Sequence, residues 1–185
     1  REIDNIADTA KSNDLAIIFF AGHGLVDNLD KYYLATAETT DGETPRKGSF
    51  SASSFNEKIA YINCKLVIFI DACYSGKLVE GMRSGGISNA QFFKELRSTK
   101  NGTNIYTSSG STSQSKEDSR YGHGVFTQAL IEACDFKNSD VDSDGRITIK
   151  EIRNYLERRI PELTKNQQKP IHRNLEEIDY PLFVK

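Results

Sequence analysis

The sequence predicts an α/β domain built on a mostly parallel central sheet with helices on both faces. Two short runs, 15–21 and 66–70, are apolar at odd and even positions alike, as is typical of parallel strands covered on both sides. Segments with helical periodicity lie around these runs. The chain of 185 residues contains no internal repeat and no long linker. We therefore expect residues 1–185 to form one domain.

The first half contains both apolar strands, each followed by small and polar residues. Ile3, Ile6 and Ala7 recur at helical spacing, and Asn13–Asp14 ends that pattern. The elements expected in the first half are a helix over 2–11, a buried strand over 15–21, a small strand over 31–35, a polar loop over 38–50, a helix over 54–60 and a buried strand over 65–71.

The second half is richer in glycine, serine and helix signals. Ser88 and Gln91 form a capping-box pattern at the start of one predicted helix. The elements expected here are an exposed loop over 77–88, a helix over 89–98, a strand over 103–108, a loop over 109–121, helices over 125–134 and 149–159, and a last short strand over 180–184.

Composition excludes several classes of function. A formal net charge of -2 gives no electrostatic reason to expect nucleic acid or an anionic membrane as partner. The apolar runs are too short to span a bilayer, and the N-terminus lacks signal-peptide character. Three cysteines without close spacing argue against a disulfide framework and against a zinc site. A reducing, cytoplasmic setting fits this pattern best.

Two polar clusters follow the two buried strands. Gly22-His23-Gly24 follows the first, and Asp71-Ala-Cys73-Tyr-Ser-Gly follows the second. In open α/β sheets, ligands bind at the carboxyl ends of the strands. An imidazole can activate a thiol, and flanking glycines free backbone N–H groups to bind an oxyanion. The clusters therefore supply the two halves of one thiol-dependent site, if their strands are neighbours.

The spacing of these motifs supports a family resemblance. Cys73 lies 50 residues after His23, which is about the spacing found in caspases. The chain resembles the caspase-like clan of cysteine peptidases, and its metacaspase and bacterial branch more than animal caspases. The resemblance implies His23 as general base and acid, Cys73 as nucleophile, and the N–H groups of Gly24 and Cys73 as the oxyanion hole. This clan uses a dyad, so no third catalytic carboxylate is required.

The same resemblance raises an expectation about what the chain lacks. The sheet of the family has six strands, two of them before the histidine strand, whereas only a helix precedes residue 15 here. We expect a caspase-like sheet without the family's first strands. The expected partners are a protein or peptide substrate and a missing N-terminal segment or regulatory subunit.

Simpler explanations exist for each motif taken alone. A cysteine at a strand end is commonly a small core residue. A second Gly-His-Gly, with His123 at its centre, precedes a predicted helix and suggests a turn residue or a contact of the substrate loop. Cys64 begins its strand at the wrong edge of the sheet, and Cys134 lies within a predicted helix. The paired motifs favour Cys73.

Asp71 stands two residues before the proposed nucleophile, where caspases carry Gln. In the metacaspase-like branch, an acid here lines the pocket for the residue preceding the scissile bond (P1), which implies preference for Arg or Lys. The alternative is an Asp that caps the following turn. Ser108, at the end of the third predicted strand, is assigned to the same substrate-binding group.

Residues 140–151 match the EF-hand calcium loop. Asp140, Asp142 and Asp144 occupy positions 1, 3 and 5, Gly145 position 6, and Glu151 position 12. Arg146 would contribute its backbone carbonyl. Thr148 with Glu151 also forms a capping box for the next helix, so a purely structural loop is the alternative. No cofactor is expected for the chemistry itself.

These observations predict a cysteine endopeptidase that cleaves after Arg or Lys and responds to calcium. The alternatives are a catalytically silent caspase-like scaffold or calcium-responsive binding module, and a different thiol hydrolase. Activation from a zymogen is also expected. The candidate self-cleavage sites are Lys77, Arg83, Lys116 and Arg120.

Overall fold

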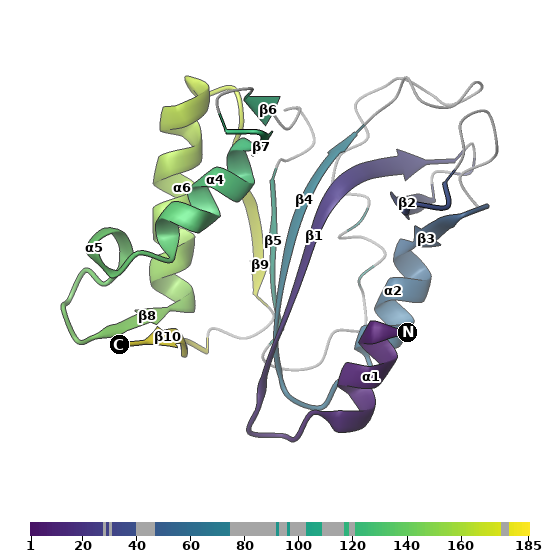
Figure 1. Ribbon diagram of the computed structural model, residues 1–185, viewed down its shortest axis with the longest axis horizontal. Helices are drawn as coiled ribbons and strands as arrows, with labels where there is room; N and C mark the ends of the chain where they lie inside the picture. Colours follow the sequence, from purple (N-terminus) through teal and green to yellow (C-terminus); the bar gives the residue numbers. More distant parts are fainter. Residues whose placement is uncertain are drawn as a thin grey trace.

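The computed structural model describes residues 1–27, 29, 31–39, 47–74, 92, 96, 103–108, 117–118, 121–174 and 178–185. They form a central sheet with strand order β3-β2-β1-β4-β5-β9 and helices on either side (Figure 1). In chain order its strands are β1 (Leu15–Val26), β2 (Tyr32–Ala35), β3 (Ser49–Ser51), β4 (Lys65–Tyr74), β5 (Thr103–Thr107) and β9 (Ile171–Asn174).

Helices and two small sheets complete the described part of the chain. The helices are α1 (Glu2–Thr9), α2 (Ala52–Ile59), α4 (Val125–Ala133), α5 (Phe136–Ser139) and α6 (Ile149–Thr164). One small sheet pairs β6 (Glu117–Asp118) with β7 (His123–Gly124), and the other pairs β8 (Arg146–Thr148) with β10 (Pro181–Val184). None of the described helices is long and apolar enough to cross a lipid bilayer.

Strands β1, β4 and β5 run parallel and form the centre of the sheet. Along β4, Ile68 and Ile70 enter one hydrophobic core, while Val67 and Phe69 enter the other. The strand is apolar at successive positions because both of its faces are covered. This arrangement confirms the predicted α/β fold.

The two key strands are longer than predicted. β1 continues to Val26 and β4 to Tyr74, so both strands pass through the polar clusters that were expected to end them. Parallel pairing extends to Gly24 opposite Tyr74, and this ladder keeps the glycine-containing segment extended. Local glycine content therefore did not mark the ends of these strands.

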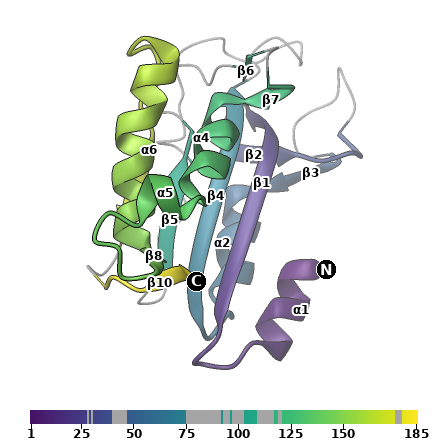
Figure 2. The same cartoon turned by 60° about the vertical axis from the view of Figure 1, so that its left-hand side comes forward.

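Each face of the sheet has its own helical layer (Figure 2). α2 packs Phe55 and Ile59 into one core, and α1 adds smaller contacts to it. α4 and α6 pack Phe126, Ile152 and Leu156 into the other core. The prediction of helices on both faces is confirmed.

Part of β1 has no neighbour on its outer edge. β2 pairs with β1 only from Gly24 to Val26, and within the described ranges no strand pairs with residues 15–23 on the side away from β4. Ile17 and Phe19 are 44% and 47% exposed there. The expected additional segment or subunit stays a prediction.

Several short elements were missed because they are polar. β9 pairs antiparallel with β5, although Ile171–Asn174 contains His172 and Arg173. β3 overlaps the end of the predicted loop over 38–50. The last strand, β10, joins β8 and not the central sheet. The predicted loop over 77–88 and most of the helix over 89–98, with its capping box, lie outside the described residues.

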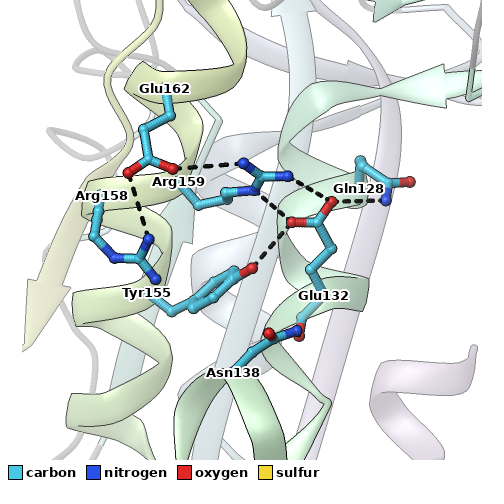
Figure 3. A network of polar contacts seen from close by, with 7 residues as sticks. All are labelled: Gln128, Glu132, Asn138, Tyr155, Arg158, Arg159 and Glu162. Atoms are coloured by element: carbon cyan, nitrogen blue, oxygen red, sulfur yellow. Dashed lines mark hydrogen bonds and ion pairs between the residues drawn. The ribbon is translucent and has the colours of Figure 1, made fainter.

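A polar network joins α4 to α6 (Figure 3). The Glu132 carboxylate accepts hydrogen bonds from Arg159 Nε at 2.6 Å and Nη2 at 3.3 Å, from Tyr155 Oη at 3.0 Å and from Gln128 Nε2 at 3.0 Å. The positive charge and the hydrogen bonds of Arg159 lower the pKa of Glu132 to about 2. This network fixes α4 on α6.

Candidate functional site

The backbone brings the two proposed catalytic residues to the same level of the sheet. His23 of β1 and Cys73 of β4 are register partners in neighbouring parallel strands. Register partners in adjacent strands lie about 5 Å apart between backbones. Sequence analysis required these strands to be neighbours, and they are. The His23 side chain is exposed to solvent.

Gly24 lies where β1 changes neighbours. It is the last residue of β1 paired with β4, opposite Tyr74, and the first paired with β2, opposite Leu34. A Cβ atom at Gly24 would lie 2.1 Å from the hydroxyl and 2.7 Å from Cζ of the buried Tyr32. A residue with a side chain does not fit at this position, which lies next to the proposed oxyanion site, so glycine is required.

Asp71 is buried at the end of β4, with 6% of its surface exposed. Its Oδ2 accepts hydrogen bonds from the Thr127 hydroxyl at 2.5 Å and from the Thr127 backbone N–H at 3.2 Å. Burial raises the pKa of Asp71, while hydrogen bonds from Thr127 and Ser108 and the nearby His123 act in the opposite direction. Asp71 thus binds the first turn of α4, whereas the turn that follows β4 lies outside the described residues.

Ser108 lies beside β4, directly after β5, and is completely buried. Its N–H donates to Ile70 O at 3.0 Å and its hydroxyl to Ala72 O at 3.3 Å. The Gln168 side chain donates in turn to Ser108 O at 2.7 Å. Ser108, directly after β5, therefore braces the end of β4, and it also acts to lower the pKa of Asp71.

The second Gly-His-Gly reaches the same end of the sheet. Its residues His123 and Gly124 form β7, directly before α4. His123 stacks on Tyr121 with ring centroids 6.1 Å apart and lies close enough to Asp71 to influence its charge. Thr127, the main partner of Asp71, was not singled out from the sequence. Its position four residues after His123, in the first turn of a predicted helix, was the available signal.

The other two cysteines do not share this position. Cys64 precedes β4 at its opposite end, and Cys134 is the C-cap of α4. Burial raises the pKa of both thiols, and their thiolate fraction at neutral pH is correspondingly small. Among the three cysteines, only Cys73 has a histidine as register partner.

The acidic loop brings three carboxylates around one point. Asp140, Asp142 and Asp144 each offer an oxygen, and these oxygens lie within 4.8 Å of one another. Asp140 also accepts hydrogen bonds from the N–H groups of Asp144 and Gly145, both at 3.1 Å. Gly145 has φ of 79°, a conformation that favours glycine and turns the chain back around the carboxylates.

Glu151, at position 12 of the loop, has a structural role as well. Its two carboxylate oxygens accept hydrogen bonds from Val141 N at 3.0 Å and Thr148 N at 2.8 Å, and it completes a capping box with Thr148. Each carboxylate oxygen retains a second lone pair for a cation. Arg146, in β8, places a backbone carbonyl in the same loop. Hard oxygen donors of this kind are the ligands that calcium prefers, and those shown to lie around one point are the carboxylates of Asp140, Asp142 and Asp144.

The four candidate self-cleavage residues, Lys77, Arg83, Lys116 and Arg120, lie outside the described residues.

Comparison with known proteins identifies the family. The model of the caspase domain, peptidase family C14, matches residues 1–176. Among solved structures, protein GSU0716 from Geobacter sulfurreducens is similar in fold, with a TM-score of 0.59 and 13% sequence identity over 93% of this chain and 70% of that chain. No curated protein matches the sequence. The match over nearly the whole chain, with His23 and Cys73 in register on neighbouring strands, means that the chain belongs to the caspase-domain family of cysteine peptidases.

Proposed function

We propose that the protein is a cysteine endopeptidase that uses His23 and Cys73 as a catalytic dyad. The observation that carries the proposal is their register partnership at the end of two parallel strands, within a chain that belongs to a peptidase family. Register partners in adjacent strands belong to the same face of a sheet, which is the arrangement that a dyad requires. The exposure of His23 leaves that side of the sheet open to a substrate.

The chemistry follows from these groups. His23 takes the thiol proton, and the Cys73 thiolate attacks the carbonyl carbon of the scissile peptide bond. The N–H groups of Gly24 and Cys73 stabilise the negative oxygen of the tetrahedral intermediate. The His23 imidazolium then protonates the leaving amine, and the C–N bond breaks. Water, activated by His23, hydrolyses the resulting thioester and restores the thiol.

Asp71 is the proposed acid of the P1 pocket. Register pairs Ala21 with Asp71 and His23 with Cys73, so the side chains of His23 and Asp71 belong to the same face of the sheet by strand alternation. A carboxylate in a buried setting attracts a cation more strongly than one in water. Arg or Lys at P1 is therefore favoured, and Asp at P1 is disfavoured by repulsion.

Cleavage of fluorogenic peptides with Arg, Lys, Asp or Leu at P1 tests both proposals. Cys73→Ala and His23→Ala should abolish cleavage while the melting temperature stays unchanged. Asp71→Asn should lower the Arg/Leu ratio of kcat/KM by roughly 30-fold, which corresponds to about 2 kcal/mol for a buried charge pair. Full activity of either dyad variant would refute the mechanism. A folded wild-type protein that cleaves no peptide would favour the silent scaffold.

A covalent probe separates a latent enzyme from a scaffold. A peptidyl chloromethyl ketone ending in Arg should modify Cys73, as located by mass spectrometry of the digested protein, and should leave Cys64 and Cys134 unmodified. Modification that is equal in His23→Ala would show that the thiol is not activated by the imidazole.

We also propose that the acidic loop binds calcium. The three carboxylates within 4.8 Å of one another support a cation site there, with the Arg146 carbonyl and Glu151 as further ligands. Calcium would neutralise the loop and connect its first residues to α6. Isothermal titration calorimetry should show one site that is lost in Asp140→Asn/Asp144→Asn. Peptidase activity with calcium and with chelator then tests whether the loop controls catalysis.

A further inference from the structure

The carboxylate of Asp71 is fixed on the first turn of α4. α4 begins at Val125 after the N-cap Gly124, so Thr127 is its third residue. Both the N–H and the hydroxyl of Thr127 donate to the same Asp71 oxygen, at 3.2 Å and 2.5 Å. The contact joins residues 56 positions apart in the sequence. A helix N-terminus and a charge-assisted O–H donor both favour the ionised carboxylate.

The packing around this contact leaves the Asp71 carboxylate little room to move. A Cβ atom at Gly124 would lie 2.3 Å from Asp71 Oδ2, so the carboxylate rests directly against the helix backbone. Gly124 has no side chain, and this allows the close approach. Asp71 in turn is two residues from Cys73 on the same strand, so α4 is attached to the strand that carries the proposed nucleophile.

We propose that Thr127 is a positioning residue that determines P1 specificity, because its hydroxyl holds the Asp71 carboxylate ionised and fixed at the pocket. This inference rests on the proposed function of Asp71 as the P1 acid. Thr127 acts through Asp71 and has no contact with the reacting atoms in this account. The preference for Arg or Lys therefore depends on one residue of β4 and one residue of α4.

The physical consequence concerns the charge of Asp71. Burial favours its neutral form, and the Thr127 hydrogen bonds oppose this effect. The groups that act on the carboxylate besides Thr127 include Ser108, which is neutral, and His123 of β7, which is titratable. The titratable His23 belongs to the same face of the sheet, on the neighbouring strand. Without the Thr127 hydroxyl, Asp71 should remain protonated to a higher pH. A cationic P1 side chain would then lose its partner in acidic solution.

Thr127→Val removes the hydroxyl at nearly constant volume and keeps the backbone N–H, and Thr127→Ser keeps both donors. Thr127→Val should lower the Arg/Leu ratio of kcat/KM about tenfold, with the value for Leu peptides changed less than about twofold. The acidic limb of the pH profile for Arg peptides should move up by about one pH unit. Thr127→Ser should resemble the wild type in both respects.

Tyr106→Phe is the matched control for loss of a buried hydroxyl. The Tyr106 hydroxyl donates to Ile149 O at 3.0 Å, at the first residue of α6, and has no contact with Asp71, Ser108 or Gln168 among the hydrogen bonds described above. This substitution should change the melting temperature without changing the Arg/Leu ratio. If Thr127→Val also keeps the wild-type ratio and pH profile while Asp71→Asn loses the preference, the positioning role is refuted and the P1 acid stands. If Asp71→Asn keeps the preference, the P1 acid itself is refuted, and the inference fails with it.

A measurement that needs no peptide cleavage tests the inference even if the enzyme is latent. Carbon NMR of the Asp71 carboxyl in the Cys73→Ala background reports its titration directly. The apparent pKa should be higher by about one pH unit in Thr127→Val than in the parent and unchanged in Tyr106→Phe. Equal titration of Asp71 in Thr127→Val and in the parent would overturn the inference even if no peptide substrate is known.

Discussion

Replacement of Glu132 by glutamine tests how α4 is held against α6 (Figure 3). The substitution keeps the size of the side chain and a carbonyl oxygen that can accept from Arg159 or Tyr155. It removes the negative charge that these donors and Gln128 surround. The loss should therefore be mainly electrostatic.

The magnitude follows from the ionisation of Glu132. Its pKa is lowered from 4.5 to about 2, chiefly by hydrogen bonds and charge from Arg159. A difference of about 2.5 pH units corresponds to at most about 3.4 kcal/mol. The side chains of Glu132 and Arg159 are 20% and 31% exposed, so solvent screens part of this energy. We expect Glu132→Gln to lower the free energy of unfolding by about 1–2 kcal/mol at pH 7.

The pH dependence has a defined direction. Because the folded-state pKa is below the unfolded-state value, the stabilisation is complete above pH 4.5 and is lost as the pH falls toward about 2. Urea denaturation of wild type and Glu132→Gln at pH 7 and pH 3 measures this. The two proteins should differ at pH 7 and converge in more acidic buffer.

A weaker ion pair of α6 is the control. Arg153 and Glu157 lie 4.0 Å apart with side chains 35% and 55% exposed. Glu157→Gln should change the free energy of unfolding by less than about 0.5 kcal/mol. Equal effects of Glu132→Gln and Glu157→Gln, or a Glu132→Gln effect that does not shrink in acid, would contradict the reasoning.

Three further predictions concern a glycine with no room for a side chain, a cysteine thiol and a buried imidazole. Gly24→Ala should lower both the melting temperature and the peptidase activity, because its Cβ would lie 2.1 Å from the Tyr32 hydroxyl. In Gly22→Ala the new Cβ would lie 3.0 Å from the end of a flexible side chain. The losses of melting temperature and of peptidase activity should therefore be smaller than in Gly24→Ala. Iodoacetamide should modify Cys134 more slowly than it modifies a free thiol at pH 7.5, by mass spectrometry, since burial raises the pKa of that group. In NMR titrations His172 should stay neutral down to about pH 4, because burial and Arg153 lower its pKa to about 4. The stability linked to this group is present above pH 6.5 and is lost as the pH falls from 6.5 toward 4.

The strands and helices were largely predictable because their signals are local. The apolar runs before His23 and Cys73 predict buried strands, and helical periodicity places α2, α4 and most of α6. Among the boundaries that were misjudged, those of β1 and α6 depend on contacts outside the segments themselves. β1 passes through Gly22 because β4 and then β2 pair with it. α6 continues past residue 159 because Ile160 is buried in the core that α6 shares with α4.

The identities of His23 and Cys73 as candidates were contained in the sequence, since each follows a buried strand and their spacing is about that of caspases. The Asp-rich spacing of the loop at 140–151 was equally visible. Only the tertiary structure decided which residues meet: His23 opposite Cys73, and Asp71 against Thr127. Strand register and the docking of α4 depend on contacts between residues about 50 positions apart, and no local periodicity encodes such contacts.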